Sequence, residues 1–151
     1  MDNNTQAIIA AHTLSEKNKQ TVLRFQMAVA EHLQGNPQPQ IADYLSDSAK
    51  WHLPYSLNES AIGSTKQGKT EILELFDDIV KRFYDPKTMS FDFYGVLAGE
   101  DKVHLHFTLA ATTTKGKRYQ SGYQILFRIE QDKIAEVWEY FDSAALFDAC
   151  A

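Results

Sequence analysis

The second half of the chain alternates apolar and polar residues with a period of two. The alternation follows the turn residues Gly99-Glu100-Asp101 and resumes after Lys115-Gly116-Lys117. Side chains that alternate in this way lie on opposite faces of a β-strand, so segments joined by short turns predict an antiparallel meander with one apolar face. The predicted strands cover residues 91–93, 102–109, 119–129 and 133–141.

Helical spacing dominates the first half of the chain instead. Thr13 and Glu16 form a capping-box pattern, and apolar residues then recur at every third or fourth position as far as Leu33. A second long helix is predicted to begin near Thr70. It ends at Asp85-Pro86, because the residue before a proline disfavours helical backbone.

The remaining segments of the first half carry weaker patterns. Residues 39–45 fit a short helix, and residues 49–54 fit a short strand that ends at Pro54. Residues 55–69 read as a long loop, and residues 1–12 as a frayed lead-in. The elements together predict an α+β fold for a single domain, residues 13–151, with helices on one face of the sheet.

Charge and cysteine content exclude several classes of function. The formal net charge is −5 and the basic residues are scattered, so the basic patch of a nucleic-acid-binding protein is missing. No run of about 18 apolar residues is present to span a membrane, and the polar start lacks the pattern of a signal peptide, so a cytoplasmic location is expected. Cys150 is the only cysteine. His104 and His106 share one side of a strand without an evident third ligand, so we expect no metal and no cofactor.

Three local strings stand in order along the chain, namely Trp51-His52-Leu53-Pro54, Gly68-Lys69 leading into Phe76, and Asp132-Lys133-Ile134 followed by Tyr140-Phe141-Asp142. Taken together, they resemble the SnoaL-like branch of the nuclear transport factor 2-like superfamily. They cover the chain from about residue 18 to its end. The resemblance implies a cone-shaped curved antiparallel sheet wrapped around the N-terminal helices, an apolar pocket between them, and dimers that use the outer face of the sheet. The superfamily includes isomerases, cyclases, dehydratases and non-enzymatic binding modules, so the fold alone assigns no reaction.

The resemblance also implies where catalytic groups would lie. The steroid isomerases of this superfamily place a general base, an oxyanion-hole acid and a phenol at positions that correspond here to Leu53, Ile125 and Phe25. All three residues are apolar, which argues against steroid-isomerase chemistry in that form. SnoaL-like cyclases use an aspartate late in the last strand, and Asp142 matches that position. Asp142 could act as a base if burial raised its pKa, or it could cap the turn that begins at Ser143.

The last predicted strand has two possible orientations. If Val137 faces the pocket, Glu139 becomes a buried acid, and Trp138 and Tyr140 lie on the outer face with Leu126. An exposed aromatic patch of this kind is typical of a partner surface and favours a homodimer. If a bulge reverses the parity, Trp138 and Tyr140 line the pocket instead. The sequence leaves both orientations open.

These features favour a small-molecule pocket protein. If it is an enzyme, the resemblance implies cofactor-independent isomerisation, cyclisation or dehydration of a small apolar or aromatic ligand, with Asp142 as the base. The alternative is a non-catalytic ligand-binding or dimerisation module. Two or more buried polar groups facing one cavity would favour the enzyme, and a wholly apolar cavity would favour the carrier. The residues expected to contact the ligand are Trp51, Leu53, Phe107, Tyr123 and Glu139.

Overall fold

Three α-helices and six β-strands form the protein, and the computed structural model describes residues 2–151. The helices are α1 (Asn3–Leu33), α2 (Lys69–Arg82) and α3 (Ser143–Cys150). The strands are β1 (Leu45–His52), β2 (Thr65–Gln67), β3 (Ser90–Gly99), β4 (Lys102–Thr112), β5 (Arg118–Glu130) and β6 (Lys133–Phe141). Three short 3-10 helices, η1 (Pro39–Tyr44), η2 (Tyr55–Leu57) and η3 (Pro86–Thr88), connect them.

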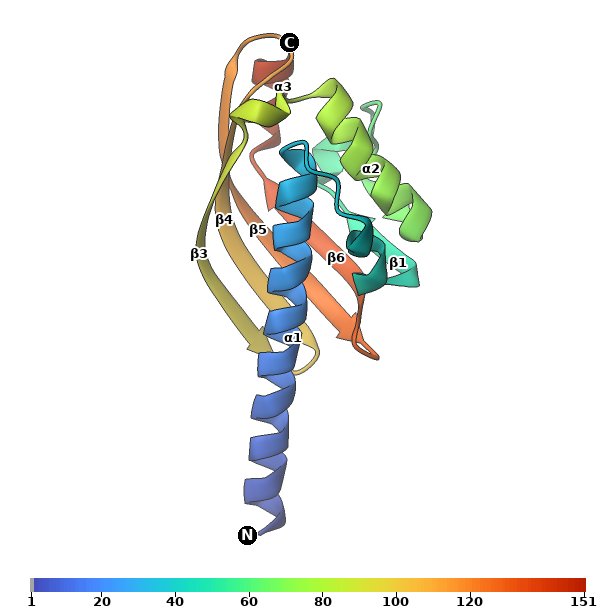
Figure 1. Ribbon diagram of the computed structural model, residues 1–151, viewed down its shortest axis with the longest axis vertical. Helices are drawn as coiled ribbons and strands as arrows, with labels where there is room; N and C mark the ends of the chain where they lie inside the picture. The colour runs from blue at the N-terminus through green and yellow to red at the C-terminus, as the bar shows by residue number, and fades with distance from the viewer. Residues whose placement is uncertain (1) are drawn as a thin grey trace.

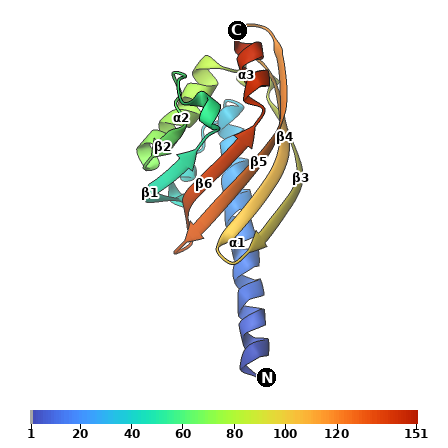
Figure 2. The ribbon, with the colours of Figure 1, turned by 180° about the vertical axis from the view of Figure 1, so that it is seen from behind.

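The strands make one curved sheet in the order β2-β1-β6-β5-β4-β3. Figure 1 shows α1 and α2 lying across one face of this sheet, which we call the inner face. Figure 2 shows the outer face, which the two long helices leave uncovered. The predicted α+β class, with a curved sheet wrapped around an N-terminal helix, is confirmed. Within residues 2–151, every helix is too short or too polar to cross a bilayer.

Helix α1 begins at Asn3, so the start predicted at Thr13 is wrong. Asp2 caps the helix by accepting a hydrogen bond from the backbone N–H of Thr5 at 2.7 Å. Thr13 lies inside the helix, where its hydroxyl donates to the carbonyl oxygen of Ile9 at 3.0 Å. Residues 3–12 contain no glycine or proline to interrupt the helix. They form an exposed helical extension beyond the sheet, whereas Met1 lies outside the described residues (Figure 1).

Phe25 on α1 is the centre of the hydrophobic core. Its fully buried ring lies with its centroid 6.0 to 6.3 Å from the rings of Tyr44, Trp51, Phe76 and Phe127. These four residues come from η1, β1, α2 and β5, so one side chain joins both long helices to the sheet. Truncating a buried phenylalanine to alanine typically costs about 3–5 kcal/mol.

The sheet differs from the prediction in the strands that come from the first half of the chain. Strands β3 to β6 pair antiparallel as expected, but β1 pairs with β6 in parallel, with Trp51 opposite Val137. The predicted loop of residues 55–69 contributes β2, which pairs with β1. Strand β1 also runs from Leu45 to His52 rather than over residues 49–54. Alternation has a period of two in parallel and antiparallel strands alike, so it could not distinguish the two pairings.

The structure selects the first orientation of the last strand. A register shift leaves Ala135 without a partner on β5, and beyond this bulge Val137 is fully buried on the inner face. Glu139 and Phe141 share that face, as alternation requires. Tyr140 points outward and is 59% exposed.

Candidate functional site

A narrow cavity of about 60 Å³ lies between the long helices and the inner face of the sheet. This volume holds roughly four water molecules. Its walls are mostly aliphatic and aromatic, and Leu146 of α3 contributes to them. The five residues predicted to contact a ligand all line this one cavity, and they are Trp51, Leu53, Phe107, Tyr123 and Glu139.

Aromatic rings from four neighbouring strands build one wall of the cavity. They are Phe91, Phe107, Tyr123 and Phe141, on β3, β4, β5 and β6. Successive ring centroids lie 6.0, 5.1 and 4.9 Å apart, and the last two pairs are stacked. The rings meet because Tyr123 is paired in register with Phe107 on one side and with Phe141 on the other. A wall of this kind suits a planar, apolar ring.

Glu139 brings the one carboxyl group among the residues that line the cavity. The indole Nε1–H of Trp51 donates a hydrogen bond to Oε2 of this carboxyl at 2.7 Å. Burial raises the pKa of Glu139 to about 7, while the Trp51 hydrogen bond acts in the opposite direction. A carboxyl with this pKa exists in both protonation states near neutral pH, which suits it to proton transfer.

Three buried tyrosines pack together, and two of them line the cavity with Glu139. The hydroxyls of Tyr119 and Tyr123 are 2.8 Å apart, and the ring of Tyr84 stacks on that of Tyr119 at 5.4 Å. Burial is the main reason that the pKa of each of the three phenols is raised above its ordinary value. They therefore stay neutral, and Tyr84 and Tyr123, which line the cavity, can offer hydrogen bonds there.

Sequence reasoning missed Gln26, the amide among the residues that line the cavity. The residue is only 4% exposed, and its Oε1 has no hydrogen-bond partner within residues 2–151. A signal was available, because Gln26 lies three residues before Val29 and seven before Leu33, on the same helical stripe. A polar residue on the buried stripe of a helix normally has a hydrogen-bond partner, so its presence there indicates a functional or structural contact.

Asp142 lies outside the cavity. Its side chain is exposed, and Oδ1 accepts a hydrogen bond from the backbone N–H of Ala145 at 3.1 Å. Asp142 is thus the N-cap of α3, and its own N–H donates to the hydroxyl of Ser121. This geometry is the capping alternative of the two predicted for Asp142, and nothing in its position supports the catalytic one.

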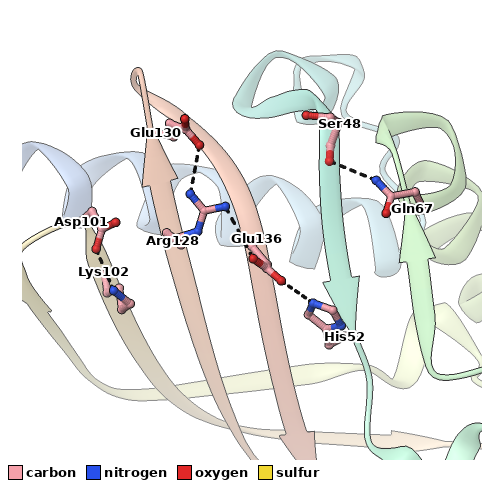
Figure 3. A network of polar contacts seen from close by, with 8 residues as sticks. All are labelled: Ser48, His52, Gln67, Asp101, Lys102, Arg128, Glu130 and Glu136. Atoms are coloured by element: carbon pink, nitrogen blue, oxygen red, sulfur yellow. Dashed lines mark hydrogen bonds and ion pairs between the residues drawn. The ribbon is translucent and has the colours of Figure 1, made fainter.

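The outer face of the sheet carries a network of charged side chains, drawn in Figure 3. Arg128 contacts Glu130 at 3.0 Å and Glu136 at 3.5 Å, and Glu136 is also hydrogen-bonded to Nε2 of His52 at 2.6 Å. The His52 hydrogen bond is the largest cause of the lowered pKa of Glu136. The His52 ring stacks on Trp138 at 5.6 Å, so the network ties the parallel strands β1 and β6 together.

Within residues 2–151 no group of three metal-ligating side chains is present, and the His104–His106 pair finds no third ligand.

The chain resembles known proteins along most of its length. The model of the SnoaL-like domain matches residues 23–137. Bal32a from a soil-derived mobile gene cassette is 22% identical, with a TM-score of 0.74 over 91% of this chain and 98% of that one. An NTF2-like protein of Burkholderia pseudomallei is 17% identical, with a TM-score of 0.75 over 89% of this chain and 98% of its own. TerC, co-crystallised with polyporic acid, is 16% identical, with a TM-score of 0.73 over the same shares. None of the curated proteins compared with the chain matches it.

Proposed function

Since this chain belongs to the SnoaL-like domain family, we propose that it binds a small apolar or aromatic ligand in its cavity and that Glu139 exchanges a proton with that ligand. The observation that carries the proposal is the carboxyl of Glu139, hydrogen-bonded to Trp51 against a wall of aromatic rings. TerC supports the first part, because a protein of this fold has been co-crystallised with polyporic acid.

Glu139 replaces Asp142 as the proposed acid–base group. The ionised carboxylate can remove a proton from an acidic C–H bond, and the resulting acid can return the proton to another atom of the same ligand. No electrons are gained or lost in such an isomerisation, cyclisation or dehydration, so the proton transfer itself calls for no redox cofactor. The Trp51 hydrogen bond holds Oε2 in place, which leaves Oε1 for the ligand.

Neutral donors near the carboxylate would stabilise the charge that develops on the ligand. The Tyr123 hydroxyl is neutral, because burial opposes ionisation of the phenol, and it shares the cavity with Glu139. A phenol in this position can donate a hydrogen bond to an enolate oxygen. Glu139, Gln26 and the phenols Tyr84 and Tyr123 are four polar side chains that line one cavity, which favours an enzyme over a passive carrier.

The cavity is smaller than most ligand sites, which reach about 300–1,000 Å³. A ligand larger than a single ring therefore requires part of the wall to move. Leu57 and Ile62 line the cavity from the segment between β1 and β2. This segment is the natural part to move, because much of it is turn and bend outside the sheet and the long helices.

Proton–deuterium exchange tests the proposal without a known product. Acetophenone and 2-tetralone carry acidic C–H bonds next to a carbonyl, and NMR in D₂O measures how fast those protons exchange. We expect the protein to accelerate exchange, with a rate that rises with pH through about 7 as Glu139 ionises. Glu139→Gln should lower the acceleration by about 10²–10⁴-fold.

Asp142→Asn is the matched control, because it changes a nearby carboxylate that lies outside the cavity. Its exchange rate should equal that of the unaltered protein. Full activity in Glu139→Gln, or loss of activity in Asp142→Asn alone, would contradict the assignment of the base. Binding of both ketones without any accelerated exchange would favour the non-catalytic ligand-binding alternative.

A further inference from the structure

We infer that the ligand of this cavity is a small aromatic compound carrying a neutral hydroxyl group, and that the side-chain amide of Gln26 binds that hydroxyl. The inference rests on the proposed binding function and names the class of ligand that the cavity selects. It starts from a buried polar side chain whose acceptor has no partner within the described chain.

Gln26 occupies a position that packing alone would fill with an apolar side chain. Its neighbours along the same stripe of α1, Val29 and Leu33, are buried hydrophobic residues. A buried amide oxygen that lacks a hydrogen bond destabilises the folded chain, because it has lost its contacts with water and gained nothing in return. A ligand that supplies the missing hydrogen bond removes this cost when it binds.

The position of Gln26 determines which part of a ligand it would meet. Helix α1 forms one side of the cavity, and the aromatic wall of Phe107 and Tyr123 forms another, on the sheet. A ring seated against this wall shares the cavity with the Gln26 amide. The unpartnered Oε1 of Gln26 accepts hydrogen bonds, so it needs a donor, which a ligand hydroxyl supplies and a carbonyl oxygen does not.

The charges around the cavity exclude an anionic group at this position. Among residues 2–151, its lining contains no lysine, arginine or histidine, and Glu139 is the one acidic residue in it. A carboxylate or phosphate on the ligand would be buried without a counter-ion and close to another carboxyl. A neutral oxygen group avoids both penalties.

Phenol and toluene form a matched pair of probes, because they have nearly the same shape and differ by a hydroxyl in place of a methyl. In a wholly apolar cavity toluene binds more tightly, since the hydroxyl of phenol must leave water without compensation. We expect the unaltered protein to prefer phenol by about threefold to tenfold, the effect of one net hydrogen bond. NMR titration measures both dissociation constants, and the side-chain amide signal of Gln26 should shift with phenol but not with toluene.

Gln26→Met keeps the length of the side chain but removes the amide, so it should reverse the preference in favour of toluene. Gln20→Met changes an exposed glutamine of the same helix and should bind both probes like the unaltered protein. A preference for phenol that survives in Gln26→Met, or an unaltered protein in which the Gln26 amide signal ignores phenol, would overturn the inference. A preference lost in Glu139→Gln but retained in Gln26→Met would assign the hydroxyl to Glu139 and overturn it as well.

The outcome for the proposed function is separate. If neither phenol nor toluene binds the unaltered protein at millimolar concentration, both the proposed binding function and the inference about Gln26 are wrong. If both bind without discrimination, the cavity binds ligands but Gln26 does not select them. The amide signal is measured on the unaltered protein, so the inference remains falsifiable even if Gln26→Met fails to fold.

Discussion

Glu139 and Asp142 are two carboxylic acids three residues apart with opposite environments. Asp142 is exposed and caps α3, whereas Glu139 faces an aromatic cavity that raises its pKa to about 7. The resemblance to cyclases favours Asp142 as the acid–base group, whereas burial favours Glu139, the group that we propose. At this scale burial, rather than position in a motif, gives a carboxyl group its chemistry.

Replacing Glu139 should change how stability depends on pH. Its pKa is raised from 4.5 to about 7 in the folded chain, so the protonated form is the one that folding favours. Its contribution to the free energy of unfolding is fully present below about pH 4.5 and is lost as the pH rises to about 7. At 1.36 kcal/mol per pKa unit this amounts to at most about 3 kcal/mol.

Urea unfolding at pH 5 and at pH 8 measures this effect. The neutral amide of Glu139→Gln accepts the same Trp51 hydrogen bond but does not ionise, so the variant should gain stability relative to the unaltered protein as the pH rises. An equal stability difference at both pH values would show that Glu139 titrates normally.

Asp142 should matter to stability through its cap alone. Asp142→Ala removes the hydrogen bond to the Ala145 N–H and should lower the free energy of unfolding by about 1 kcal/mol. Asp142→Asn retains a capping oxygen and should cost less. Thermal or urea unfolding compares the two, and indistinguishable stabilities for the alanine variant and the unaltered protein would argue against the cap.

Helix α1 divides into a packed part and a free part. From Val22 onwards its apolar stripe is buried against the sheet, whereas residues 3–12 are exposed on every side. Isolated helical segments of this length are marginal in water, because few hydrogen bonds must offset a costly nucleation. The stability of the element therefore comes from Phe25 and its neighbours and not from the extension.

Deleting residues 2–12 should leave the free energy of unfolding within about 0.5 kcal/mol of the unaltered value, since the segment has no buried side chain. Phe25→Ala in the full chain is the contrasting variant and should cost about 3–5 kcal/mol. Hydrogen exchange should be fast over residues 3–12 and slow around Phe25. Strong protection of residues 3–12 would contradict this prediction, because it would mean that the extension packs against another surface.

The two long helices leave the outer face of the whole sheet uncovered (Figure 2). Leu126, Trp138 and Tyr140 lie on it. The same face carries the network of Arg128 and Glu136, which Figure 3 shows. Aromatic side chains exposed on a sheet, with charged groups at their rim, are typical of an interface. The homodimer predicted from the sequence therefore remains a prediction for this face.

Light scattering tests the assembly of the whole molecule. We expect a particle of twice the chain mass of 17.2 kDa, and we expect Tyr140→Lys to shift it towards the monomer by placing two charges at the symmetric contact. Met27→Lys is the control, because Met27 is equally exposed, at 59%, but lies on α1. A monomer at high micromolar concentration, without any substitution, would end the prediction.

The sequence by itself determined the features that depend on neighbouring residues. Alternation and turn residues predicted β3 to β6, because hairpins connect strands that are adjacent in the chain. Spacing in α1 predicted the buried face around Phe25, and the local strings predicted the family. The five residues expected to contact a ligand, among them Trp51 and Glu139, all line the cavity. The start of α1 was misplaced because Asp2 and Thr13 are both acceptable caps, and only the absence of a helix breaker between them favours Asp2.

Only the tertiary structure decided the features that depend on distant residues. The parallel pairing of β1 with β6 joins Trp51 to Val137 across most of the chain, and no local pattern encodes it. That pairing, with the bulge at Ala135, sets which side of β6 faces inward and brings the Trp51 indole to the Glu139 carboxyl. The pKa of Glu139 is raised because several elements bury the carboxyl at once. The sequence could therefore name this residue as a candidate, but its raised pKa depends on the packed fold.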